Sequence, residues 1–152
     1  MAKFNYRLQN ILNLMVNFEE QAKQNFAERR RILTDEEERL ENLNAKQEQL
    51  ENYARELRTG DIDIKKIIEN KYEQKYVEDE IKKQKVKVNV ARKNLEAARV
   101  RMEDAVKERK IHEKLRENAF EDFVEEESAK ELMEIDGLTS YVYGIKNGNS
   151  VL

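Results

Sequence analysis

Histidine, cysteine and glycine-rich loops are frequent in catalytic, zinc and nucleotide sites, and this sequence holds few of these residues. His112 is the only histidine and there is no cysteine, so neither a nucleophile–base pair nor a zinc site of about four ligands can be assembled. We expect His112 to lie at the edge of a helix seam. The glycines never form the phosphate-binding loop that ends in Gly-Lys-Ser/Thr. The sequence therefore predicts no enzyme activity, no cofactor and no small-molecule substrate.

The composition is that of a long helix. Charged residues make up 40% of the 152 residues, and the chain contains no proline and no tryptophan. Strong helix formers such as Ala, Leu, Glu, Lys, Gln and Arg dominate. The near balance of 29 basic and 32 acidic residues argues against a dedicated nucleic-acid binder. No apolar run approaches the roughly 20 residues that span a bilayer, and the first residues are too polar for a signal peptide. We expect a cytoplasmic protein without direct membrane insertion.

Apolar residues recur at heptad spacing from about Phe4 to Arg58, which predicts a first long helix. At Phe18, Ala22 and Phe26 two steps of four residues follow one another, which predicts a stutter. The predicted seam comprises Phe4, Leu8, Ile11, Met15, Phe18, Ala22, Phe26, Leu33, Leu40, Leu43, Leu50, Ala54 and Leu57.

Residues 59–63 (TGDID) interrupt the pattern, and Gly60 suits the position after a helix end, while Asp61 or Asp63 suits the next N-cap. A second helix is expected from about Ile64 to Ile135. Its predicted seam comprises Val77, Ile81, Val88, Ala91, Leu95, Ala98, Met102, Ala105, Ile111, Leu115, Ala119, Phe123 and Leu132. Gly137 is expected to end this helix, and residues 137–152 are expected to form a flexible tail.

These lengths favour an all-α antiparallel two-helix coiled coil, a single domain over residues 1–136. The second helical stretch is longer than the first, so a tight hairpin at Gly60 leaves its last turns unpaired. We therefore expect a short helical tip over residues 59–77 and arms of about 4–58 and 78–135. This alignment places Arg58 opposite about Glu78 and Phe4 near Leu132, and it sets Asp35–Glu38 against Arg99 and Arg101. The charge pairing is also compatible with the tight hairpin.

Two features suggest binding partners. Residues 82–116 carry 13 basic and 5 acidic residues, whereas residues 117–136 carry 1 basic and 9 acidic residues. This segregation fits ordinary solvated helix faces, or two ends made for different partners. An apolar and tyrosine-rich cluster near the tip fits either internal closure of the tip or a partner-binding patch. The cluster comprises Leu50, Tyr53, Leu57, Ile62, Ile64, Ile67, Ile68, Tyr72, Tyr76, Val77 and Ile81.

The chain opens with two aromatic residues followed by a leucine, in residues 2–12 (AKFNYRLQNIL). This segment resembles the F-x-F-x-L-x-x-(I/L)-L start of the flagellar export protein FliJ family. Further similar segments are residues 19–23 (EEQAK), 89–95 (NVARKNL), 105–110 (AVKERK) and 113–115 (EKL). The resemblance covers about residues 2–136.

The resemblance implies a non-enzymatic, stalk-like coiled coil of the bacterial flagellar type III export apparatus, with a chaperone role in flagellum assembly and motility. It implies binding to the hexameric export ATPase, to the cytoplasmic part of the membrane export gate and to export chaperones. The location it implies is cytoplasmic, peripheral to the inner membrane at the flagellar base. The family's gate-contacting spacing fits Lys46, Leu50, Tyr53 and Leu57, with Val77, Ile81, Gln84 and Val88 on the returning helix. The implied ATPase-binding end comprises Phe4, Tyr6, Leu8, Ile11, Phe120, Phe123 and Leu132.

Two other functions fit the sequence. A generic scaffold or dimerising coiled coil fits the diluted seam, in which Arg29, Glu36 and Gln47 occupy core positions. A nucleic-acid-associated protein fits the basic residues 82–93, although only Tyr76 lies near enough to offer a stacking ring.

Overall fold

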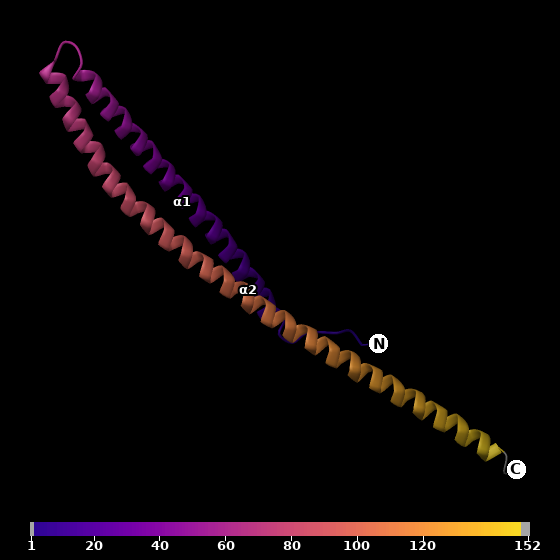
Figure 1. Cartoon of the computed structure of the whole chain (residues 1–152). Helices are drawn as coiled ribbons and strands as arrows, with labels where there is room; N and C mark the ends of the chain where they lie inside the picture. Colours follow the sequence, from indigo (N-terminus) through magenta and orange to yellow (C-terminus); the bar gives the residue numbers. More distant parts are fainter. Residues whose placement is uncertain (1, 150–152) are drawn as a thin grey trace. The chain divides into compact units, whose positions relative to one another are not determined.

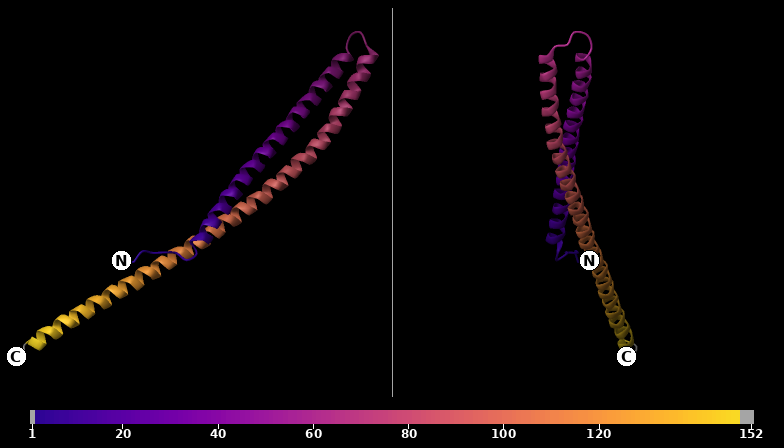
Figure 2. Two further views of the ribbon diagram at one scale, coloured as in Figure 1. Left: turned by 180° about the vertical axis from the view of Figure 1, so that it is seen from behind. Right: turned by 60° about the vertical axis from the view of Figure 1, so that its left-hand side comes forward.

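Two long helices make up the fold. The structure is a computed structural model that describes residues 2–149, and its helices are α1 (Gln9–Leu57) and α2 (Ile64–Asn149). The helices pack against each other in antiparallel orientation, and no strand occurs among the described residues. In Figures 1 and 2 the two helices lie side by side as they lead away from the connecting turn. The predicted all-α helical hairpin is confirmed.

The packing divides the chain into two compact units, and α1 and α2 contribute to both. One unit contains Glu19–Ala105 and therefore the turn between the helices. The other contains the described residues up to Phe18 together with those from Val106 onward. The expectation of a single domain over residues 1–136 stays a prediction.

The turn follows the capping chemistry predicted for it. Gly60 has a φ of +73°, a left-handed conformation that costs glycine little because it has no Cβ. The Thr59 hydroxyl donates a hydrogen bond of 2.8 Å to the carbonyl of Glu56 and so satisfies one of the last carbonyls of α1. The Asp63 carboxylate accepts from the amide of Lys65 at 3.1 Å and caps the N-terminus of α2. Asp63, rather than Asp61, is thus the N-cap.

The buried face of α1 keeps one unbroken heptad repeat. Buried or half-buried residues occur at Leu12, Met15, Glu19, Ala22, Phe26, Arg29, Leu33, Glu36, Leu40, Leu43, Gln47, Leu50, Ala54 and Leu57. The steps alternate between three and four residues throughout, so the predicted stutter at Phe18 is wrong. Phe18 is exposed and Glu19 is buried in its place, with Lys23 as an ion-pair partner at 2.9 Å. An uninterrupted repeat keeps the seam facing the second helix along its length.

The buried face of α2 follows the same repeat and includes three amide side chains. Buried or half-buried residues occur at Ile67, Asn70, Gln74, Val77, Ile81, Gln84, Val88, Ala91, Leu95, Ala98, Met102 and Ala105. Among the later positions of the predicted seam, Ile111, Leu115 and Leu132 are exposed, whereas Ala119 and Phe123 are half-buried.

The axial register differs from the predicted one. Asn70 donates a hydrogen bond of 3.0 Å to the carbonyl of Leu50, and Gln84 donates one of 2.9 Å to the carbonyl of Glu36. Residues 64–77 are therefore the first turns of α2 and pair with α1, instead of forming a separate tip. Glu37 pairs with Arg92 at 3.6 Å, so the acidic run does not face Arg99 and Arg101. A buried amide needs an acceptor, and this alignment supplies one to each.

Helix α2 continues past the residue predicted to end it. Gly137 lies within α2, which extends to Asn149, so the expected tail is helical over residues 137–149. Residues 150–152 of that tail lie outside the described residues. A glycine inside a helix costs about 1 kcal/mol relative to alanine. Residues 128–148 are all exposed.

Candidate partner-binding surfaces

An apolar stripe on the outside of α2 begins beside the turn. Ile64, Ile68, Tyr72 and Tyr76 follow one another at four-residue steps, and all four are exposed, Tyr72 by 74%. We call these four residues the outer stripe. Lysines flank it, and Lys71 lines a shallow surface groove together with Ile68, Tyr72 and Lys75. Exposed tyrosine and isoleucine side chains with a polar rim are typical of protein interfaces.

The residues predicted to contact the export gate divide into exposed, half-buried and buried groups. Lys46 and Tyr53 on α1 are exposed, and Leu50, Leu57 and Ile81 are half-buried. The other three residues are buried, Val77 to 1% exposure, Val88 to 2% and Gln84 to 6%.

Burial changes the role of these last three side chains. Val77 and Val88 pack in the seam, and Gln84 bonds to Glu36 of α1. They hold the hairpin together and cannot meet a partner while it is folded. The prediction that these three residues of α2 contact the gate is therefore wrong. Within the predicted tip cluster, the residues of α2 that are exposed to solvent are those of the outer stripe.

Aromatic rings gather around Phe4 in the other unit. The centroid of the Phe4 ring lies 5.2 Å from that of Phe120, edge to face, and 5.3 Å from that of Phe123. The guanidinium of Arg116 lies 5.6 Å from the Phe4 ring centroid, and its Nε donates a hydrogen bond of 2.9 Å to Gln9. Ring pairs of this geometry contribute about 0.5–1.5 kcal/mol beyond area burial. The cluster thus fastens the non-helical N-terminal residues to α2.

The remaining residues predicted for this end are placed differently. Tyr6 is buried, whereas Leu8 and Ile11 are exposed because Leu12 occupies the seam. Leu132 is also exposed and lies on the part of α2 beyond the half-buried Phe123. The structure therefore brings Phe4, Phe120 and Phe123 together as predicted, without Leu132.

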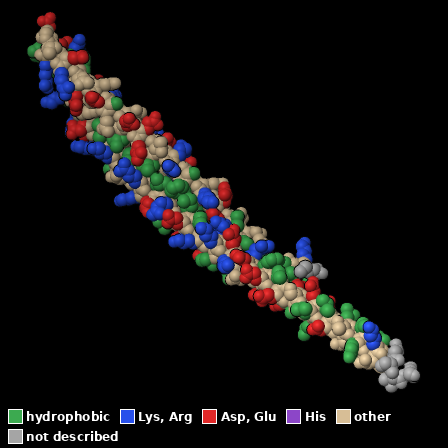
Figure 3. All heavy atoms as spheres, turned by 45° about the vertical axis from the view of Figure 1, so that its right-hand side comes forward, with side chains coloured by type: hydrophobic (Ala, Val, Ile, Leu, Met, Phe, Trp, Pro, Cys, Tyr) green, Lys and Arg blue, Asp and Glu red, His purple; other side chains and the backbone are tan. Residues whose placement is uncertain are grey.

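The last turns of α2 carry the densest exposed apolar surface of the described chain. The exposed side chains are Leu132, Met133, Ile135, Leu138, Tyr141, Val142, Tyr143 and Ile145. In the space-filling view, charged side chains cover much of the visible face, and hydrophobic side chains also gather along the end of the chain beside the grey atoms (Figure 3). The sequence interpretation missed this surface because glycine suggested a helix end at residue 137.

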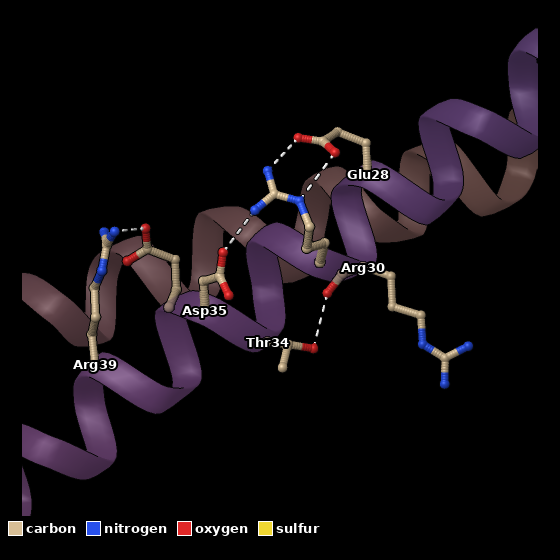
Figure 4. A network of polar contacts seen from close by, with 7 residues as sticks. Glu28, Arg30, Thr34, Asp35 and Arg39 are labelled. Atoms are coloured by element: carbon tan, nitrogen blue, oxygen red, sulfur yellow. Dashed lines mark hydrogen bonds and ion pairs between the residues drawn. The ribbon is translucent and has the colours of Figure 1, made fainter.

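Charged side chains form short networks along each helix. Arg31 Nη2 bonds to Glu28 Oε1 at 2.6 Å, and Arg31 Nη1 bonds to Asp35 Oδ2 at 2.9 Å (Figure 4). Hydrogen bonding to Arg31 lowers the pKa of Glu28 from 4.5, and hydrogen bonding to Arg99 does the same for Glu96. The same contacts raise the pKa of Arg31 and Arg99. All of these pairs are exposed, so each contributes little to stability.

Membrane-spanning helices and metal-binding groups are both absent from the described residues. Neither α1 nor the described length of α2 contains a stretch long and apolar enough to cross a membrane. Among residues 2–149, no group of three or more His, Cys, Asp or Glu side chains lies close enough to hold a metal ion. The candidate sites described above are three surfaces: the outer stripe, the Phe4 cluster and the end of α2.

Comparison with known protein families matches residues 4–148 to the family described as Flagellar FliJ protein. The chain belongs to this family. Membership makes it a component of the flagellar export system and confirms the resemblance seen in the sequence. The match extends through the last turns of α2, which the sequence resemblance did not include. A search of curated proteins finds no significant match.

A solved structure shows that the fold of this FliJ-family chain recurs elsewhere. The structure of a protein described as a YscO homologue from Chlamydia trachomatis superimposes with a TM-score of 0.74. It is 23% identical in sequence, and the match covers 95% of this chain and 98% of that chain. This likeness shows a shared fold over nearly the whole length of both chains.

Proposed function

We propose that this FliJ-family chain is a non-enzymatic stalk and adaptor, which binds the hexameric export ATPase at one surface and the membrane export gate at another. The observation that carries the proposal is that two of the candidate surfaces, each with exposed aromatic side chains, lie in different compact units of the chain. One is the outer stripe beside the turn, and the other is the Phe4 cluster with its exposed neighbours. Two surfaces of this kind suit a protein that links two partners.

The outer stripe is the surface that we assign to the gate. Its tyrosines supply large, amphipathic contact area, and its lysines suit an acidic partner. The exposed Lys46 and Tyr53 of α1 belong to the same proposed contact set, whereas the buried Val77, Gln84 and Val88 do not. Binding here places the protein peripherally at the cytoplasmic face of the inner membrane.

The Phe4 cluster is the surface that we assign to the ATPase. Phe4 and Phe123 are half-buried, whereas Phe120 and the nearby Leu8 and Ile11 are exposed. A partly exposed aromatic anchor held in place by its neighbours matches the usual centre of a binding interface. Export chaperones are the third class of partner that we propose, at a surface still to be located.

A matched pair of double variants tests the gate assignment. Tyr72 and Tyr76 are both exposed, and so are Tyr141 and Tyr143 near the end of α2. We expect Tyr72→Ala with Tyr76→Ala to weaken binding to the purified cytoplasmic part of the gate at least tenfold. Tyr141→Ala with Tyr143→Ala should leave that affinity unchanged. Equal losses in both variants would reject the outer stripe as the gate surface.

ATP hydrolysis by the cognate export ATPase tests the other assignment. The intact chain should raise the hydrolysis rate and co-purify with the ATPase. Phe4→Ala should weaken both effects, whereas the Tyr72 and Tyr76 double variant should retain them. Absence of a complex with the intact chain at micromolar concentration would contradict the proposed stalk function.

A further inference from the structure

The apolar surface near the end of α2 is not a continuation of the seam that faces α1. That seam passes through Ala105 and continues every seven residues to Met133 and Ser140. The exposed side chains of Ile135, Leu138, Val142 and Ile145 instead follow steps of three, four and three residues. They fall on the opposite side of the helix from Ser140. A longer α1 would therefore leave this stripe uncovered.

The spacing of this stripe indicates what kind of surface covers it. Steps of three and four residues are those of a heptad seam, which packs against another helix. The positions that flank the stripe carry only one acidic residue, Glu134, and one basic residue, Lys146. This is unusual in a chain in which 40% of the residues are charged. A nearly uncharged rim allows two identical stripes to meet without repulsion.

Charge outside the stripe selects the orientation of such a pair. Residues 117–136 carry nine acidic residues and one basic residue. In a parallel pair these stretches would lie beside each other and repel. In an antiparallel pair the two acidic stretches point away from each other. Residues 131–136 of one copy then lie beside residues 144–149 of the other, and the only charged residue among 144–149 is Lys146.

We propose that the ends of α2 from two copies of this chain pair in antiparallel orientation through residues 135–145. Ile135 of one copy lies opposite Ile145 of the other, and Leu138 lies opposite Val142. Each of these contacts occurs twice because of the two-fold symmetry. Tyr141 lies at a position that flanks the stripe. In the antiparallel pair it contacts Tyr141 of the other copy.

The interface is short, so the association is weak and depends on concentration. Residues 135–145 of each copy form ~16 Å of helix at 1.5 Å per residue. Such a contact buries much less than the ~1,600 Å² of a standard protein interface. A weak pair suits a surface that is covered in the free protein and given up when another partner arrives. The pairing does not depend on the proposed contacts with the ATPase and the gate.

Engineered cysteines test the pairing and its direction, because the natural sequence has none. A tagged Leu138→Cys chain and an untagged Val142→Cys chain should form a mixed disulfide dimer on mild oxidation at high protein concentration. Each variant alone should form at least fivefold less dimer. Ser140→Cys, on the opposite side of the same helix turns, is the control and should stay monomeric. Efficient dimers of Leu138→Cys alone, or no excess of the mixed dimer over the control, would overturn the proposal.

Sedimentation provides a second readout that needs no cysteine. The average mass of the intact chain should rise with concentration, and Val142→Asp should abolish that rise. Met133→Asp is the matched control, because Met133 is an exposed apolar residue on another side of the helix. It should leave the rise unchanged. A constant monomer mass for the intact chain, or equal effects of both substitutions, would reject self-pairing and leave the ATPase and gate assignments standing.

Discussion

The side chain of Asn70 donates a hydrogen bond of 3.0 Å to the backbone carbonyl of Leu50, across the two helices of the hairpin. Gln84, fourteen residues further along α2, does the same to Glu36, fourteen residues back along α1. Both pairs thus have the same axial offset. A slip of the helices by one residue would leave two buried amides without their acceptors, at a cost of about 1–3 kcal/mol each.

Replacing both amides should make the hairpin more stable but allow more than one alignment of its two helices. We expect Asn70→Leu with Gln84→Leu to raise the melting temperature, because apolar seam residues pack well in coiled coils. The same variant should populate more than one alignment of α1 and α2. Spin labels at the exposed positions Lys46→Cys and Lys75→Cys should give one narrow distance distribution in the parent and a broad or multiple one in the variant.

Conservative amide exchanges provide the control for this experiment. Asn70→Gln and Gln84→Asn keep a donor at each position and should retain a single alignment. One narrow distance in the leucine variant, equal to that of the parent, would show that the amides do not set the register.

Two neighbouring residues distinguish the observed seam from the predicted one. Leu12 is buried and Ile11 is exposed, although the apolar pattern alone placed Ile11 in the seam. Leu12→Ala should lower the free energy of unfolding by about 2 kcal/mol or more, and Ile11→Ala by less than about 1 kcal/mol. Urea denaturation followed by circular dichroism measures both values. A larger loss for Ile11→Ala would contradict the assigned phase of α1.

Phe4 should hold the residues before α1 in place. Its ring packs against Phe120 and Phe123, so Phe4→Ala removes two aromatic contacts and the contact with Arg116. We expect lower heteronuclear NOE values for the amides of residues 4–7, with the hairpin around Asn70 unaffected. Phe18→Ala removes an exposed phenylalanine and is the control. Unchanged NOE values in Phe4→Ala would show that the ring cluster does not order this segment.

The Glu28 carboxylate should titrate below its ordinary range. Hydrogen bonding to Arg31 lowers the pKa of Glu28 from 4.5, so its pairing contributes fully above that value and is lost as the pH falls through the lower, folded-state pKa. Carbon NMR of the Glu28 carboxyl against pH measures the midpoint. Arg31→Gln should raise the midpoint towards 4.5.

Arg30 provides the control for this titration. Its backbone carbonyl accepts from Thr34, and its side chain points away from Glu28 (Figure 4). Arg30→Gln should therefore leave the Glu28 midpoint nearly unchanged. Equal shifts in both variants would mean that general charge, and not the Arg31 hydrogen bond, lowers the pKa. Added salt should weaken the difference, because the pair is exposed.

The features that depend on neighbouring residues in the sequence, such as the turn and most of the α1 seam, were predictable from the sequence. The turn needs a left-handed residue and a capping oxygen, and Gly60 and Asp63 provide them in the expected places. The α1 seam from Ala22 onward follows from its spacing, because there the apolar residues form a single stripe. Family membership was also predictable, since the aromatic start of the chain resembles that of the FliJ family.

The features that depend on a second helix were not predictable in the same way. Near the N-terminus, Ile11 and Phe18 compete with Leu12 and Glu19 for the seam, and only the pairing with α2 decides between them. The register depends on buried amides whose acceptors are backbone carbonyls. Every residue has such a carbonyl, so the sequence carries no mark of which one is used.

The binding surfaces have a similar limit. The family resemblance implied a partner-binding stripe through Val77, Gln84 and Val88, but it could not tell whether α1 or a partner covers these residues. In the structure α1 covers them, and the exposed residues lie on the outer stripe. Whether the outer stripe binds the gate and the Phe4 cluster binds the ATPase stays a prediction.

The two amide ties across the hairpin have a mechanical consequence. Apolar side chains interlock along the seam, and a directional hydrogen bond between the helices adds a further restraint on their position along the axis. Asn70 and Gln84 act as two pins in the same hairpin. The two hydrogen bonds therefore oppose a shift of α1 along α2 when a load acts on either helix within this unit.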